Sequence, residues 1–108
     1  MAVTSVAHAT QSATVTTEHT LDTQTTAGVY VLVVNTVNMV AGDILVLRLK
    51  TKAVHDGTSR SAYSAVYSGV QAEIQKYSPP VPIDTEIICT LQQTDGTSRD
   101  FEWNLLKL

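Results

Sequence analysis

Hydrophobic and polar residues alternate with a period of two along most of the chain, which is the pattern of half-buried β-strands. In the segment Ile44–Lys52, leucines expected to face the core alternate with basic residues expected to face solvent: Leu45, Leu47 and Leu49 against Arg48, Lys50 and Lys52. The segment Gly28–Thr36 is apolar on both faces, as expected for a strand that is covered on both sides. Further strands are expected at Ala13–Leu21, Ser61–Ser68 and Thr85–Gln93, the last with Ile87, Cys89 and Leu91 facing inward. In a final strand, Phe101 and Trp103 share one face, and Asp100, Glu102 and Asn104 take the other.

The pentapeptide Asp-Gly-Thr-Ser-Arg occurs twice, at Asp56–Arg60 and at Asp95–Arg99, each time between two strand-forming runs. Asp-Gly favours tight hairpin turns, because glycine adopts a positive φ without steric penalty. The sequence therefore predicts two antiparallel hairpins, with Gly57 and Gly96 both at positive φ. The residues predicted to face inward before Gly57 are Leu45, Leu47 and Leu49, and they precede it by an even number of positions. Those before Gly96 are Ile87, Cys89 and Leu91, and they precede it by an odd number. The repeat is thus interpreted as recurring turn chemistry and not as a duplication.

Two stretches do not follow the alternation. In Ser68–Tyr77, the spacing of Val70, Ile74 and Tyr77 fits a short helix, but ten residues are marginal for one, so helix and strand both stay open. Ser78–Pro82 contains three prolines, which lack the N–H that a ladder strand needs. We expect it to be a rigid, extended crossover between the sheets or along an edge.

Six or seven strands separated by turns predict an all-β fold, an antiparallel β-sandwich of jelly-roll-like type with room for one short helix. A chain of 108 residues is long enough for one domain with its own core. Residues 1–12 have too little apolar content to pack alone. We therefore expect an N-terminal arm at 1–12 and a single sandwich domain at 13–108. The arm is either a disordered leader or a segment that orders only on a neighbouring subunit.

Composition and charge narrow the class of protein. Sixteen Thr and fourteen Val favour strands, and 16% charged residues is below the usual quarter, which suggests a neutral surface that packs against something or relies on hydroxyls. A net charge of −3, with one basic cluster at Arg48, Lys50 and Lys52, argues against nucleic-acid binding. The chain shows no signal peptide and no apolar run long enough to cross a membrane, so we expect it to be made in a cytoplasm.

The sequence offers little chemistry. The single cysteine, Cys89, excludes an internal disulfide and is expected to be a buried hydrophobe. The histidines are His8, His19 and His55, and Glu18-His19 lacks the spacing of a known metal motif. No Gly-x-Ser-x-Gly elbow positions a nucleophile. We therefore predict no catalytic residue, no cofactor and no metal, and a protein that is not an enzyme. Trp103 with Tyr63, Tyr67 or Tyr77 could form a sugar platform, but core packing is favoured.

Several short motifs follow one another in a characteristic order: Thr17–Leu21, Thr25–Tyr30, Gly42–Asp43, a charged strand, Ser78–Pro79, Gly96–Arg99 and Trp103. This order, over most of Val15–Leu108, resembles a family of short structural proteins of tailed bacteriophages, typically encoded near the major capsid protein. The chain departs from the family pattern in a short Asp22–Thr26 loop and in the proline-rich Ser78–Pro82.

The resemblance implies a virion component without catalytic residues, a capsid decoration or cement protein on the outer surface of the phage head. Its partners would be the major capsid protein and further copies of itself, as a dimer or trimer. The alternatives are a head–tail connector or tail component, and a carbohydrate-binding module on the virion surface. The residues expected at the interface come from the arm and the proline-rich segment: Val3, Val6, His8, Tyr77, Pro79 and Pro80.

Overall fold

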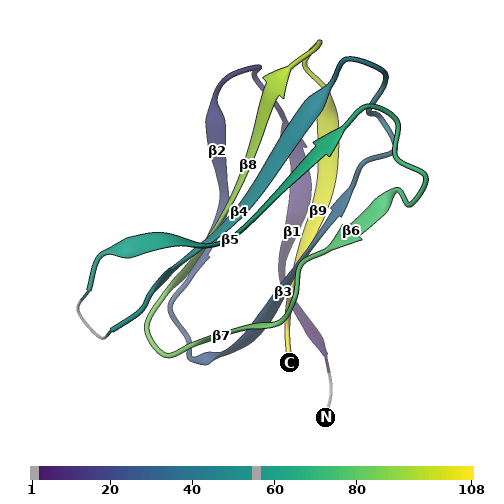
Figure 1. The fold of residues 1–108 in the computed structure, drawn as a ribbon. Coiled ribbons are helices and arrows are strands. Elements are labelled where there is room, and N and C mark those ends of the chain that lie inside the picture. The colour runs from purple at the N-terminus through teal and green to yellow at the C-terminus, as the bar shows by residue number, and fades with distance from the viewer. Residues whose placement is uncertain (1–2, 55–56) are drawn as a thin grey trace.

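Two antiparallel sheets lie face to face in the computed structural model, which describes residues 3–54 and 57–108 (Figure 1). The first sheet has the strand order β1-β9-β3-β6, with β7 also paired to β3. Its strands are β1 (Thr4–Ser12), β9 (Asp100–Lys107), β3 (Gly28–Asn35), β6 (Gln75–Tyr77) and β7 (Val81–Ile83). The second sheet has the order β2-β8-β4-β5. Its strands are β2 (Glu18–Gln24), β8 (Ile87–Asp95), β4 (Ile44–Lys52) and β5 (Ser59–Ser68). The predicted all-β antiparallel sandwich is confirmed.

The core lies between the sheets and is built from alternate residues of four central strands. Each strand contributes three apolar side chains to the core cluster: Tyr30, Leu32 and Val34 from β3, Leu45, Leu47 and Leu49 from β4, Ile87, Cys89 and Leu91 from β8, and Phe101, Trp103 and Leu105 from β9. The inward faces predicted for β4, β8 and β9 are therefore correct. On β3 the second apolar face, which includes Val31 and Val33, is only half-buried, because no further layer covers it.

The N-terminal segment is a correction to the sequence prediction. Thr4–Ser12 is strand β1, which pairs with β9 from Thr4 opposite Lys107 to Ser12 opposite Asp100. This segment is therefore part of the sandwich and not an arm that orders only on a neighbour. The expectation failed because it weighed apolar content alone, whereas a strand can be held by the backbone hydrogen bonds that it makes with an edge.

The two Asp-Gly-Thr-Ser-Arg segments have different roles. The first does join a hairpin, since β4 and β5 pair along their whole length, but Gly57 is not at positive φ, and Asp56 lies outside the described residues. The second is not a hairpin, because β8 and β9 belong to different sheets. Gly96 has the predicted positive φ, at 89°, in a turn that carries the chain from one sheet to the other.

Three other segments also differ in part from the prediction. β2 begins at Glu18, not at Ala13, after a turn in which Thr16 has a φ of 72°, and it continues to Gln24 through part of the expected loop. No helix occurs in the described residues, and Ser68–Tyr77 ends in the short strand β6. The proline-rich segment runs extended along β3 as expected, but Val81–Ile83 does pair with it as β7. Pro82 is tolerated there because β7 is an edge strand.

Truncation of Leu47 tests the assignment of the core face. Leu47 is only 5% exposed and lies between Ala65 of β5 and Leu91 of β8. We expect Leu47→Ala to lower the free energy of unfolding by about 2–5 kcal/mol, the usual cost of a large-to-small change in a core. The matched control is Val66→Ala, at a β5 position that is 64% exposed, which should change stability by less than about 0.5 kcal/mol. Urea denaturation of both variants measures the difference, and equal effects would mean that the faces are misassigned.

Candidate functional site

Glu18 and His19 were considered above as possible metal ligands. Both side chains instead bind other residues of the protein. The Glu18 carboxylate lies 3.2 Å from Arg48 Nη1 and 3.2 Å from Lys50 Nζ, and it accepts a hydrogen bond from Thr90 Oγ1 at 2.7 Å. The Thr90 hydroxyl, together with the two cations, holds the pKa of Glu18 below its usual range despite partial burial. His19 Nε2 accepts a hydrogen bond from the Thr14 N–H at 2.9 Å. Arg48 and Lys50 are therefore half-buried partners of Glu18 and not freely solvated charges.

The other reactive residue types are also accounted for in the described ranges. Burial among apolar side chains, with a smaller contribution from Asp22, raises the pKa of the Cys89 thiol to about 12, so the thiol stays protonated at neutral pH. Cys89 is thus the buried hydrophobe that was predicted. His8 is exposed on β1, and His55 lies outside the described residues. Across residues 3–54 and 57–108, no cluster of three or more His, Cys, Asp or Glu side chains could hold a metal ion.

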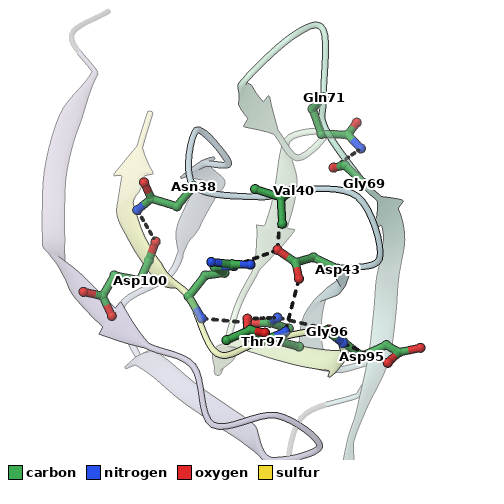
Figure 2. Close-up of polar contacts among 11 residues, drawn as sticks. Asn38, Val40, Asp43, Gly69, Gln71, Asp95, Gly96, Thr97 and Asp100 are labelled. Atoms are coloured by element: carbon green, nitrogen blue, oxygen red, sulfur yellow. Dashed lines mark hydrogen bonds and ion pairs between the residues drawn. The ribbon is translucent and has the colours of Figure 1, made fainter.

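The loop from β3 to β4 lies at the end of the sandwich away from the chain termini (Figure 1), and a buried aspartate, Asp43, ends this loop directly before β4. Asp43 is almost fully buried, and its Oδ2 lies 2.9 Å from Arg99 Nε. The same carboxylate accepts hydrogen bonds from the Val40 N–H at 3.0 Å and from the Thr97 N–H at 3.3 Å. Figure 2 shows Asp43 turned toward both Val40 and Thr97, which belong to different loops. One side chain therefore joins the β3–β4 loop to the β8–β9 turn.

The electrostatics of Asp43 follow from these contacts. Burial raises the pKa of the carboxyl, but the hydrogen bonds from Val40, Arg99 and Thr97 outweigh burial and leave the pKa of Asp43 below its usual range. The carboxylate is therefore ionised at neutral pH. The neighbouring β8–β9 turn is also fixed from inside, because the buried Gln93 donates to the Thr97 carbonyl at 2.7 Å and accepts from the Arg99 N–H at 3.1 Å.

The loops at this end present apolar side chains to solvent. The β3–β4 loop exposes Val37 and Val40, and the β5–β6 loop exposes Val70 and Ile74. The two loops lie side by side, since the Thr36 N–H donates to the Ile74 carbonyl at 2.7 Å and the Gly69 N–H donates to the Asp43 carbonyl at 2.8 Å. We call the four exposed residues, Val37, Val40, Val70 and Ile74, the loop-end patch. Exposed apolar residues on neighbouring loops are a candidate surface for binding another protein.

A second candidate surface is a hollow of about 480 Å³ on the outer face of the first sheet. Four side chains form a row across it, because His8 lies opposite Asn104, Asn104 opposite Val33, and Val33 opposite Tyr77. This row crosses strands β1, β9, β3 and β6. Asn35, Gln75 and Glu102 also line the hollow, together with the exposed Tyr77 ring. The lining is mainly polar and uncharged.

The residues predicted for the interface do not form one surface. His8 and Tyr77 line the same hollow, although they are 69 positions apart in the sequence. Val3 is exposed beside the start of β1, whereas Val6 is half-buried and packs against the core. Pro79 and Pro80 are exposed on the segment between β6 and β7. Trp103, the other half of the considered sugar platform, is buried, as core packing requires.

The sequence did not point to Asp43 or to the amides of the hollow. Asp43 stood out only within the short motif Gly42–Asp43, and its partner Arg99 follows 56 positions later, so no local signal joined them. Asn104 and Glu102 were correctly placed on the outer face of the last strand. Their neighbours across the sheet could not be predicted, because these depend on the order of the strands.

Comparisons with protein-family models, curated proteins and solved structures find no match to this chain. No helix in the described residues is long and apolar enough to span a membrane.

Proposed function

We propose that this chain is a non-enzymatic structural protein of a tailed-phage virion, a decoration protein that binds the outer surface of the capsid and stabilises it. The observation that carries the proposal is the loop-end patch, four exposed apolar side chains on two loops that are joined to each other by backbone hydrogen bonds. The resemblance of the ordered motifs to phage structural proteins supports the same function. The low content of charged residues, 16%, suits a protein whose surface is covered after assembly.

In this proposal the mechanism is mechanical. Each copy sets its loop-end patch against the major capsid protein and bridges neighbouring capsid subunits. The contact removes apolar surface from water across the seam, and this added burial opposes the pressure of the packaged genome. A support that is already rigid in the free protein loses little conformational entropy on docking, so more of the contact energy remains for binding.

Self-association, also part of the proposal, has a candidate location on β5. This strand is an edge of the second sheet, ten residues long, without proline and with Arg60 as its single charged residue. Natural sheet edges are usually protected by charge, proline or short length. An unprotected edge of this length suits pairing with a second copy, which would extend the sheet across a two-fold axis.

Binding to empty shells tests the proposed docking surface. We expect the purified protein to co-sediment with DNA-free shells of the phage, and Val70→Asp to weaken this binding at least about tenfold, because a carboxylate in an apolar contact is costly. The matched control is Val54→Asp, which adds the same charge at a similarly exposed position in the β4–β5 loop, outside both the loop-end patch and β5, and should bind as the unchanged protein does. Equal melting temperatures of the free variants would confirm that both remain folded.

Two outcomes would contradict the proposal. If the unchanged protein does not sediment with shells, it is not a decoration protein. If Val70→Asp binds normally, the loop-end patch is not the docking surface. The number of copies per particle, measured from the intensity of this protein's band on a stained gel of purified phage, separates decoration from the head–tail or tail alternative. A decoration protein requires a copy number that matches the capsid lattice, whereas a connector requires the copy number of a single ring.

A further inference from the structure

The hollow on the outer face of the first sheet contains several polar side chains without partners. The side chains of His8, Gln75, Tyr77 and Glu102 make no hydrogen bond or ion pair with any residue that the structure describes. On a surface that contacts only water, polar side chains have no reason to be grouped around one depression. Here they lie around one depression and come from three different strands, β1, β6 and β9.

The two asparagines of the hollow are held in place by local contacts. Asn104 Oδ1 accepts a hydrogen bond from the Ser5 hydroxyl at 2.6 Å, and Asn35 Oδ1 accepts one from the Val37 N–H at 2.9 Å. In each case the carbonyl oxygen of the amide is used and the amide nitrogen has no partner among the described residues. The donors are thus fixed in orientation before any ligand arrives, which lowers the entropy cost of binding.

The lining chemistry selects a class of ligand. Amide groups both donate and accept hydrogen bonds, as sugar hydroxyls do, and the Glu102 carboxylate can accept from two hydroxyls. The Tyr77 ring is 59% exposed and offers an apolar face for the C–H groups of a pyranose ring. No lysine or arginine lines the hollow, so an anionic ligand would meet Glu102 without a compensating cation. The volume, about 480 Å³, lies within the range of small-molecule sites.

We infer that this hollow is a binding site for neutral saccharides, with Tyr77 stacking on the sugar ring and Asn35, Gln75, Glu102 and Asn104 bonding its hydroxyls. The inference goes beyond capsid decoration, because none of the residues that line the hollow belongs to the loop-end patch. A chain of sugars would lie across the strands, along the row from His8 to Tyr77. The two surfaces would allow one copy to hold the capsid and a glycan at once.

Titration of the isolated, isotope-labelled protein with methyl glycosides of glucose, galactose, mannose and N-acetylglucosamine tests the site by NMR. Concentrations should reach about 20 mM, because a single sugar contact is expected to bind only at millimolar strength. We expect at least one glycoside to shift backbone amides of β1, β3, β6 and β9 around the hollow. Methyl glucuronide, which carries a carboxylate, should bind at least about threefold more weakly than methyl glucoside, because it meets Glu102.

Variants of Tyr77 separate a specific site from general surface contact. Tyr77→Ala should weaken binding at least about fivefold, whereas Tyr77→Phe keeps the ring and should bind within about twofold of the unchanged protein. Val66→Ala, an exposed strand residue on the other sheet, is the control and should have no effect. The inference is overturned if no glycoside shifts the hollow, if Tyr77→Ala binds normally, or if the glucuronide binds most tightly. Since no shell is present, these outcomes are independent of the proposed capsid function.

Discussion

Replacement of Asp43 by alanine is expected to lower the free energy of unfolding by about 3 kcal/mol or more, the largest effect expected for any exchange of a polar side chain in this chain. The change leaves the N–H groups of Val40 and Thr97 without their acceptor. It also leaves Arg99, whose side chain is only 28% exposed, without its counter-ion. Urea denaturation at neutral pH measures the loss.

The control for this prediction is Asp100→Ala. Asp100 is an exposed aspartate near the same end, and its side chain makes no hydrogen bond or ion pair within the described residues, although its carbonyl accepts a hydrogen bond from Asn38 Nδ2. Its removal should change stability by less than about 0.5 kcal/mol. If the two alanine variants unfold at the same urea concentration, the Asp43 contacts do not hold the loops together.

The pH dependence of stability offers a second readout of the same contacts. The pKa of Asp43 is lower in the folded protein than in the unfolded chain, so its stabilising contribution is complete above the unfolded value, about 3.9, and is lost as the pH falls through the folded value. The pKa of Glu18 is also lowered, so the unchanged protein should lose stability below about pH 4 for both reasons. The Asp43→Ala variant should lose less over this range, and the difference between the two curves belongs to Asp43.

The sequence predicted those parts of the fold that local alternation determines. The inward leucines of β4 and the buried Ile87, Cys89 and Leu91 of β8 follow from period two alone, because each strand has one face on the core. The alternation could not show which strands are neighbours. Asp-Gly at residues 95–96 has the composition of a hairpin turn, yet the chain there crosses to the other sheet. Turn chemistry depends on a few backbone angles, and a crossover turn can use the same positive φ at Gly96 as a hairpin.

The sequence did contain one sign that the two repeated pentapeptides differ, namely the positions of the core-facing residues that precede each glycine. Strand β4 presents its core face at even positions before Gly57, and β8 does so at odd positions before Gly96, so the two turns leave their strands from different faces. The candidate sites depend still more on tertiary structure. The row of His8, Asn104, Val33 and Tyr77 exists only because four strands far apart in the sequence become neighbours in one sheet. Side chains that converge in this way leave no local pattern.

Deletion of residues 1–12 is the second change with a large expected effect, and the structure reverses what the sequence led us to expect. An arm that orders only on a neighbour could be removed without loss of stability, whereas β1 pairs with β9 along eight residues. Its loss would expose the backbone edge of β9 and uncover part of the core beside Val6 and Ala7. We expect the melting temperature of the truncated protein to fall by more than about 10 °C, which corresponds to a loss of a few kcal/mol in a domain of this size.

A truncation that begins at Thr4 keeps the whole of β1 and is the matched control, with an expected change of less than about 3 °C. A synthetic peptide of residues 4–12 provides the decisive measurement. Added in excess to the protein that lacks residues 1–12, it should occupy the vacant edge of β9 and raise the melting temperature in a concentration-dependent manner, because a ligand that binds only the folded state stabilises it. A peptide of the same composition in scrambled order should not, since it cannot place Val6 and Ala7 against the core. An unchanged melting temperature after deletion would restore the interpretation of this segment as an arm.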